Sequence, residues 1–72
     1  MFKRKSKVER IKDMIRNIIS IDRGLANDAL NKANKFIEDP RIHAMYMDDY
    51  RYFRDDMLSY MHILDLIDEE FR

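Results

Sequence analysis

The stretch 39-DPRIHAMYMDDYRYFRDDMLSYMHILDLIDEEF-71 contains the strongest periodic pattern in this 72-residue chain. Asp39 and Pro40 are typical of a helix start, because an aspartate caps the first turn and a proline suits the first helical position. No glycine or proline follows, so the sequence predicts one helix over about residues 40–71. Its apolar residues form a heptad repeat, with alternating intervals of four and three: Tyr46, Tyr50, Phe53, Met57, Tyr60, Leu64, Ile67 and Phe71.

The first part of the chain has the pattern of two shorter helices that meet near Gly24, the only glycine. The first, over about 7–22, opens on a Ser-x-x-Glu capping box, and its apolar face is Val8, Ile11, Ile15 and Ile18. The second, over about 26–38, offers small residues to a neighbouring helix: Ala26, Ala29 and Ala33. The spacing of the first face, when continued, lands on Asp22 and Lys32, and this change of phase favours a break at the glycine.

These elements predict an all-α fold, a small bundle of two or three helices in one domain over 1–72, preceded by a basic arm over 1–6. A helix of about 32 residues spans roughly 48 Å, whereas a compact globule of this length is roughly 29 Å across. The fold should therefore be elongated. A small core without cysteine has no disulfide to stabilise it, so we expect the chain to form a homodimer or to bind a partner.

Charge is sorted along the chain although the net charge is zero. Residues 1–16 contain seven Lys or Arg and two acidic residues, while residues 41–72 contain four Arg and eight acidic residues. If the long helix runs antiparallel to the preceding segment, the basic beginning lies beside the acidic end. The hypothesis is that residues 3–16 face the carboxylates near the end of the last helix: Asp65, Asp68, Glu69 and Glu70. Such exposed pairs affect alignment more than stability.

The last helix has more apolar surface than one partner helix can cover. Some of its large residues lie on the heptad face, where they suit a core or a dimer interface, and others lie beside it, where they suit a protein partner. Together they form the predicted partner or dimer interface: Met45, Tyr46, Tyr50, Tyr52, Phe53, Met57, Tyr60, Met61 and Leu66.

Two charged segments are further candidate sites. Carboxylates seven residues apart form a predicted acidic face, which suits either solvent or a basic partner: Asp48, Asp49, Asp55 and Asp56. The basic residues at the beginning of the chain could contact nucleic-acid phosphates, or could instead pair with the acidic end: Lys3, Arg4, Lys5, Lys7 and Arg10. An anionic membrane surface is disfavoured, because the adjacent apolar face is needed for the core.

The chain lacks the motifs of catalysis or cofactor binding. One glycine cannot form a phosphate-binding loop, and the three serines have no local His–acid pattern. His43 and His62 are too far apart in sequence for a recognisable metal site. No motif identifies a family. We therefore expect a non-enzymatic, cytoplasmic protein without cofactor or metal, a small regulator or inhibitor that binds a protein partner and self-associates. The alternative is a nucleic-acid-binding regulator.

Overall fold

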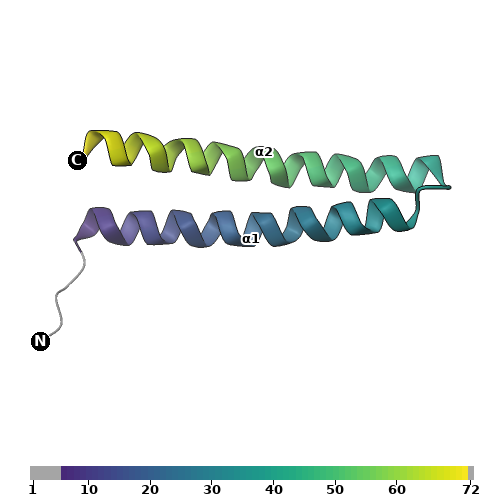
Figure 1. Cartoon of the computed structure of the whole chain (residues 1–72), viewed down its shortest axis with the longest axis horizontal. Helices are drawn as coiled ribbons and strands as arrows, with labels where there is room; N and C mark the ends of the chain where they lie inside the picture. The colour runs from purple at the N-terminus through teal and green to yellow at the C-terminus, as the bar shows by residue number, and fades with distance from the viewer. Residues whose placement is uncertain (1–5, 72) are drawn as a thin grey trace, which may run out of the picture.

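A computed structural model describes residues 6–71, which form an α-helical hairpin. Helix α1 (Lys7–Lys35) and helix α2 (Pro40–Glu70) lie side by side and run in opposite directions, joined by a short turn at one end (Figure 1). The expected all-α class and the long final helix are confirmed. Two helices are present in the described residues, and the radius of gyration is 16.6 Å, against about 11 Å for a compact chain of this length. The expected elongated shape is also confirmed.

Both helices begin at the predicted capping residues. The Ser6 hydroxyl accepts a hydrogen bond from the Glu9 amide at 3.1 Å. The Asp39 carboxylate accepts one from the Ile42 amide at 3.3 Å, and Pro40 occupies the first turn. Each cap satisfies an amide that has no partner within its own helix.

The turn is held by a hydrogen bond between the helices. α1 ends at Lys35, which leaves the carbonyl of Ala33 without its usual partner four residues later. The Nδ1 of His43, in the first turn of α2, donates to that carbonyl oxygen at 2.8 Å. A side chain of α2 therefore completes the last turn of α1 and fixes where the second helix starts.

The heptad face of α2 packs on α1 as the spacing predicts, from Tyr46 to Ile67. The seven residues of this seam are half-buried, and no residue of α2 is fully buried. Phe71 is an exception to the prediction, because α2 ends at Glu70 and the Phe71 side chain is 63% exposed. It does not extend the seam.

The predicted break at Gly24 is wrong. α1 is continuous through this position, and nothing lies within 4 Å of where a glycine side chain would begin. The glycine is exposed within the helix and does not end it. The two helices expected over 7–22 and 26–38 are one, and α1 ends at Lys35.

The apparent change of phase arose because α1 has two apolar stripes. Its buried seam follows a heptad spacing that accepts an acidic residue in the middle: Ile15, Ile19, Asp22, Ala26, Ala29 and Ala33. Of the residues expected in the core, Ile11 is instead 49% exposed. The sequence-based face had combined members of the seam with members of a second, exposed stripe.

The hairpin also brings the basic beginning of α1 beside the acidic end of α2. Lys12 Nζ lies 2.6 Å from Asp68 Oδ1, and the Lys12 side chain is largely covered. The hydrogen bond to Asp68 has the largest effect and raises the pKa of Lys12. Desolvation, the next largest effect, opposes it, and the charges of Asp68 and Glu9 raise the pKa further. For this pair, the predicted antiparallel alignment of opposite charges is confirmed.

Candidate interaction surface

The aromatic residues of the α2 seam belong to the interior of the hairpin. Phe36, in the turn, stacks on Tyr46 with ring centroids 5.9 Å apart, and Lys32 Nζ lies over the Tyr46 ring, 5.9 Å from its centroid. The remaining seam members of the predicted interface are half-buried in the same way: Tyr50, Phe53, Met57 and Tyr60. These side chains are therefore only partly available to another molecule.

The other predicted interface residues are exposed. Met45 (52%), Tyr52 (68%) and Leu66 (49%) lie on one column of α2, at spacings of seven and fourteen residues. We call these three the α2 column. Met61 is on the opposite side of the hairpin, in a shallow hollow beside residues of α1: Arg16, Ile19, Ser20 and Arg23. The structure thus separates Met61 from the α2 column.

Sequence reasoning missed a larger apolar surface on α1. Five residues at spacings of three and four form what we call the α1 stripe: Ile11, Met14, Ile18, Ile21 and Leu25. Ile18 is half-buried, and the other four are between 42% and 65% exposed. The intervals of three and four are visible in the sequence as a heptad of their own. Sequence analysis assigned some of these residues and some of the seam residues to a single face.

The α1 stripe shares one broad side of the hairpin with part of α2. Leu25 and Lys32, seven residues apart, line the same hollow as Asp49 of α2. Positions seven apart repeat on one side of a helix in this packing, so Asp56 and Ile63 lie on that side too. Ile63 and Leu66, which are 42% and 49% exposed, extend the apolar surface across both helices. We call this side of the molecule the stripe face.

The predicted acidic face is divided by the fold. Asp48, Asp49 and Asp55 are exposed. Asp48 lies 3.7 Å from Arg51 and Asp55 lies 3.4 Å from Arg54, so arginines of the same helix offset part of this charge. Asp56 is half-buried and turned toward α1. It is therefore not part of a solvated acidic surface.

Asp56 meets Asp22, an acidic residue in the α1 seam. Asp22 is 6% exposed, and its Oδ2 has no hydrogen-bond partner. The hydrogen-bonding contact with Asp56, burial, and the charge of Asp56 all raise the pKa of Asp22. Two carboxyl groups can share a hydrogen bond only when one holds a proton, so the pair favours a protonated state.

The candidate nucleic-acid contacts are only partly within the described residues. Lys3, Arg4 and Lys5 lie outside them. Lys7 and Arg10 are exposed in the first turn of α1. Lys12, just beyond, is paired with Asp68. The basic beginning of α1 is therefore partly offset by α2.

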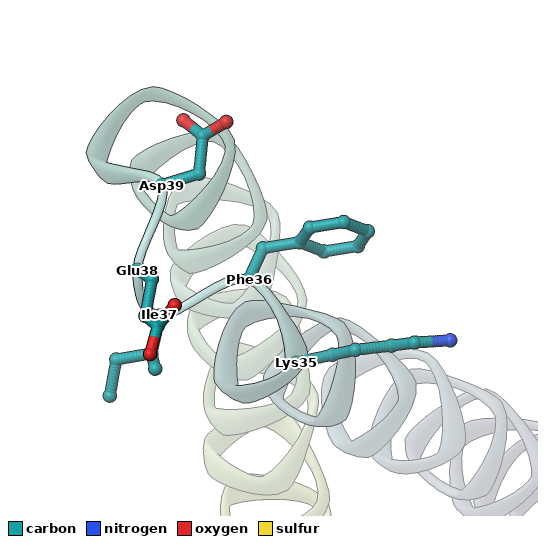
Figure 2. A pocket seen from close by; sticks show the side chains of 5 residues that line it. All are labelled: Lys35, Phe36, Ile37, Glu38 and Asp39. Carbon is teal, nitrogen blue, oxygen red and sulfur yellow. The ribbon is translucent and has the colours of Figure 1, made fainter.

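The hollow at the turn does not form a ligand site. It is lined by Lys35, Phe36, Ile37, Glu38 and Asp39, and Figure 2 shows Phe36, Ile37 and Asp39 pointing in three different directions. Their functional groups do not converge on a common point. All five residues are exposed.

The described residues contain no group of three or more His, Cys, Asp or Glu side chains placed to hold a metal ion. Within residues 6–71, neither helix is both long and apolar enough to cross a membrane. The sequence matches no protein-family model, and comparison with curated proteins and with solved structures likewise found no match.

Proposed function

We propose that this chain is a non-enzymatic interaction protein that self-associates and binds a protein partner. The observation that carries the proposal is the extent of apolar surface that the hairpin leaves uncovered on both helices. Thirteen large apolar side chains are exposed in the described residues, including Met14 at 65% and Tyr52 at 68%. Contiguous apolar surface on a small protein is typical of sites that another protein covers.

The core of the single hairpin is thin for an independent fold. Ala33 is the only fully covered seam residue, and no large side chain is fully buried in the described part of the chain. A core of this size seldom supplies more than about 3–5 kcal/mol, and helices of this kind normally gain stability by packing into bundles. Self-association would cover surface that two helices alone leave in water.

The α2 column is the proposed surface for the partner. Met45, Tyr52 and Leu66 combine a flexible thioether, an aromatic ring and an aliphatic side chain, types that suit a helix or groove of another protein. Exposed carboxylates lie beside it, Asp48 and Asp49 among them, so a partner with a basic rim is favoured. By occupying such a partner, the protein would act as a regulator or inhibitor.

Two measurements test this function. Light scattering after gel filtration should give a mass above the 8.8 kDa of one chain, and a clean monomer would contradict self-association. Tyr52→Ala and Met45→Ala should keep their helicity but weaken capture of a partner from the native host. Leu58→Ala, an equally exposed site on the other side of α2, is the matched control. Equal capture by all four proteins would rule out the α2 column.

Nucleic-acid binding is the second candidate, favoured by the exposed Lys7 and Arg10 at the beginning of α1. Phosphate contacts release counterions, so such binding should fall steeply as salt increases. Titration of labelled DNA and RNA at two salt concentrations, with Lys3, Arg4 and Lys5 replaced by Ala, distinguishes it from the first proposal. Strong, salt-sensitive binding that these replacements abolish would favour nucleic-acid binding over the protein-partner function.

A further inference from the structure

We propose that the stripe face is the self-association surface, and that a second copy of the chain covers it with its own stripe face in antiparallel orientation. In this dimer the α1 stripes pack on each other, and Ile18 lies next to the two-fold axis. The inference rests on the self-association part of the proposed function and adds the surface, the orientation and the register.

The α1 stripe has the geometry of a second helix-packing seam. Its intervals of three and four match those of the seam buried between α1 and α2, but its side chains point away from that seam. The stripe runs for about 21 Å along α1, as the rise of an α-helix gives for these residues. Ile63 and Leu66 lie beside it, so the apolar surface covers the width of the hairpin. Leu66 also belongs to the α2 column, so the second copy and the proposed partner would compete for this residue.

The stripe face also borders the incompletely buried core. Tyr46 and Phe53 of the α2 seam line the hollow on this side together with Leu25. A second hairpin stacked here would cover the partly exposed ring of Phe53 together with the stripe, forming a four-helix bundle. A closed two-fold dimer is the commonest way to bury one such surface on identical chains.

The available area is sufficient for a stable dimer. If the axis passes near Ile18, the two hairpins overlap along about 33 Å, and two adjacent helices are about 20 Å wide. This gives roughly 660 Å² on each partner, or about 1,300 Å² in total, within the range of specific interfaces.

Charges at the ends of the stripe favour the antiparallel orientation. Asp28 continues the stripe spacing beyond Leu25, and Lys7 continues it before Ile11; both are exposed. Antiparallel packing brings Asp28 of one copy near Lys7 of the other. Parallel packing of the two α1 helices would bring each of these groups against its own counterpart. Packing of α1 on α2 of the second copy would place Asp28 beside Asp49, with Lys32, which pairs with Asp28 at 3.0 Å, close to both. Like charges therefore disfavour the parallel arrangement most.

The absence of cysteine from the sequence allows a direct test by single-cysteine crosslinking. In the proposed dimer Ile18→Cys forms a disulfide-linked dimer under mild oxidation. Ile11→Cys and Leu25→Cys alone do not, because each lies about 21 Å from its own counterpart, beyond the roughly 7 Å between Cα atoms that a disulfide tolerates. A mixture of these two variants should crosslink to each other. Ser20→Cys, exposed on the opposite side of α1, is the control and should remain monomeric on a non-reducing gel.

A second measurement does not depend on crosslinking. Met14→Glu places a charge in the stripe about one turn from its centre, at a side chain that is 65% exposed, so the hairpin should still fold. Its mass by light scattering should fall from dimer to monomer, a twofold loss, while Leu58→Glu on the other side of the hairpin should remain dimeric.

The outcomes separate this inference from the function on which it rests. A monomeric parent protein would contradict self-association itself. A dimeric parent in which Ile11→Cys links to itself would contradict the antiparallel orientation. If the parent is dimeric but Met14→Glu is dimeric as well, or Ser20→Cys crosslinks in place of Ile18→Cys, another surface forms the dimer and only the present inference fails.

Discussion

The half of the hairpin near the turn and the half near the chain ends are packed differently. In the turn half, residues 22–56, the small Ala26, Ala29 and Ala33 are buried opposite the aromatic part of the α2 seam. In the open half, residues 7–21 and 57–70, isoleucine, leucine and methionine occur both in the seam and outside it. The turn half packs small residues against rings but still exposes Leu25, Phe36, Ile37, Met45 and Tyr52, whereas the open half exposes isoleucine, leucine and methionine side chains along both helices. Another chain would therefore bury the most apolar surface by packing on the open half.

The largest effect on stability should come from enlarging a buried alanine in the turn half. Ala33 is fully covered by its surroundings, so Ala33→Leu must push the helices apart. We expect a loss of about 1–3 kcal/mol in the free energy of unfolding, measured by urea denaturation followed by circular dichroism. Ala44→Leu, at an exposed alanine of α2, should change it by less than about 0.5 kcal/mol. Equal effects would show that the turn half is not tightly packed.

The hydrogen bond across the turn should contribute less. His43→Ala removes the donor to the Ala33 carbonyl, and we expect a loss of about 1 kcal/mol, typical of one such bond. His62→Ala removes the other histidine, which is exposed on the same helix, and should be nearly neutral. If the two variants unfold at the same urea concentration, the turn does not depend on this contact.

Asp22, at the boundary between the two halves, should make the stability of the hairpin depend on pH. Because the pKa of Asp22 is raised above its unfolded value of 3.8, the folded chain binds more protons than the unfolded chain just above that pH. The stability that this proton binding contributes is fully present below the unfolded pKa of Asp22, and it is lost as pH rises through the higher folded pKa. Asp22→Asn should therefore be more stable than the parent at pH 7 and depend less on pH between 4 and 7, measured by thermal denaturation. A parent protein that gains stability across this interval, with the variant following it, would contradict this assignment.

The smallest effect should come from the ion pair of the open half. Lys12→Gln removes the contact with Asp68 and should lower the thermal midpoint slightly. Salt screens such pairs, so the difference from the parent should shrink in 1 M NaCl. Arg51→Gln, which removes a pair within α2, is the control for loss of charge without loss of a contact between helices. A larger effect of Lys12→Gln at high salt would mean that its aliphatic chain matters more than its charge.

Most of the fold could be predicted from residues whose role is local. The heptad of α2 from Tyr46 to Ile67, the caps at Ser6 and Asp39, and the proline at the helix start each determine structure within a few positions, and all are confirmed. The last heptad position, Phe71, is wrong because α2 ends before it. The role of Gly24 was not predicted correctly. A glycine inside a helix and a glycine that ends one look alike in sequence, and only their structural surroundings distinguish them. Asp22 was missed for a related reason, since periodicity alone does not predict that a carboxylate will be accepted in an apolar seam.

The candidate surface was harder to predict than the fold. The α2 seam and the α2 column could be distinguished because their spacing in sequence is regular and separate. The α1 stripe could not be distinguished from the α1 seam until α2 was in place, because both contain isoleucine and both follow intervals of three and four. Which of two equivalent stripes is buried depends on the partner helix.

The single turn at one end of the molecule has a consequence for how the chain folds. Contacts near the turn, such as Ala33 with His43, close a loop of about ten residues, whereas Lys12 and Asp68 close one more than five times longer. Each doubling of loop length costs about 0.6 kcal/mol of closure entropy, so the long loop is favourable only after the short one has formed. The hairpin should therefore close progressively from the turn outward and open in the reverse order. The apolar stripe, near the ends, would be the last part to become ordered and the first to be released.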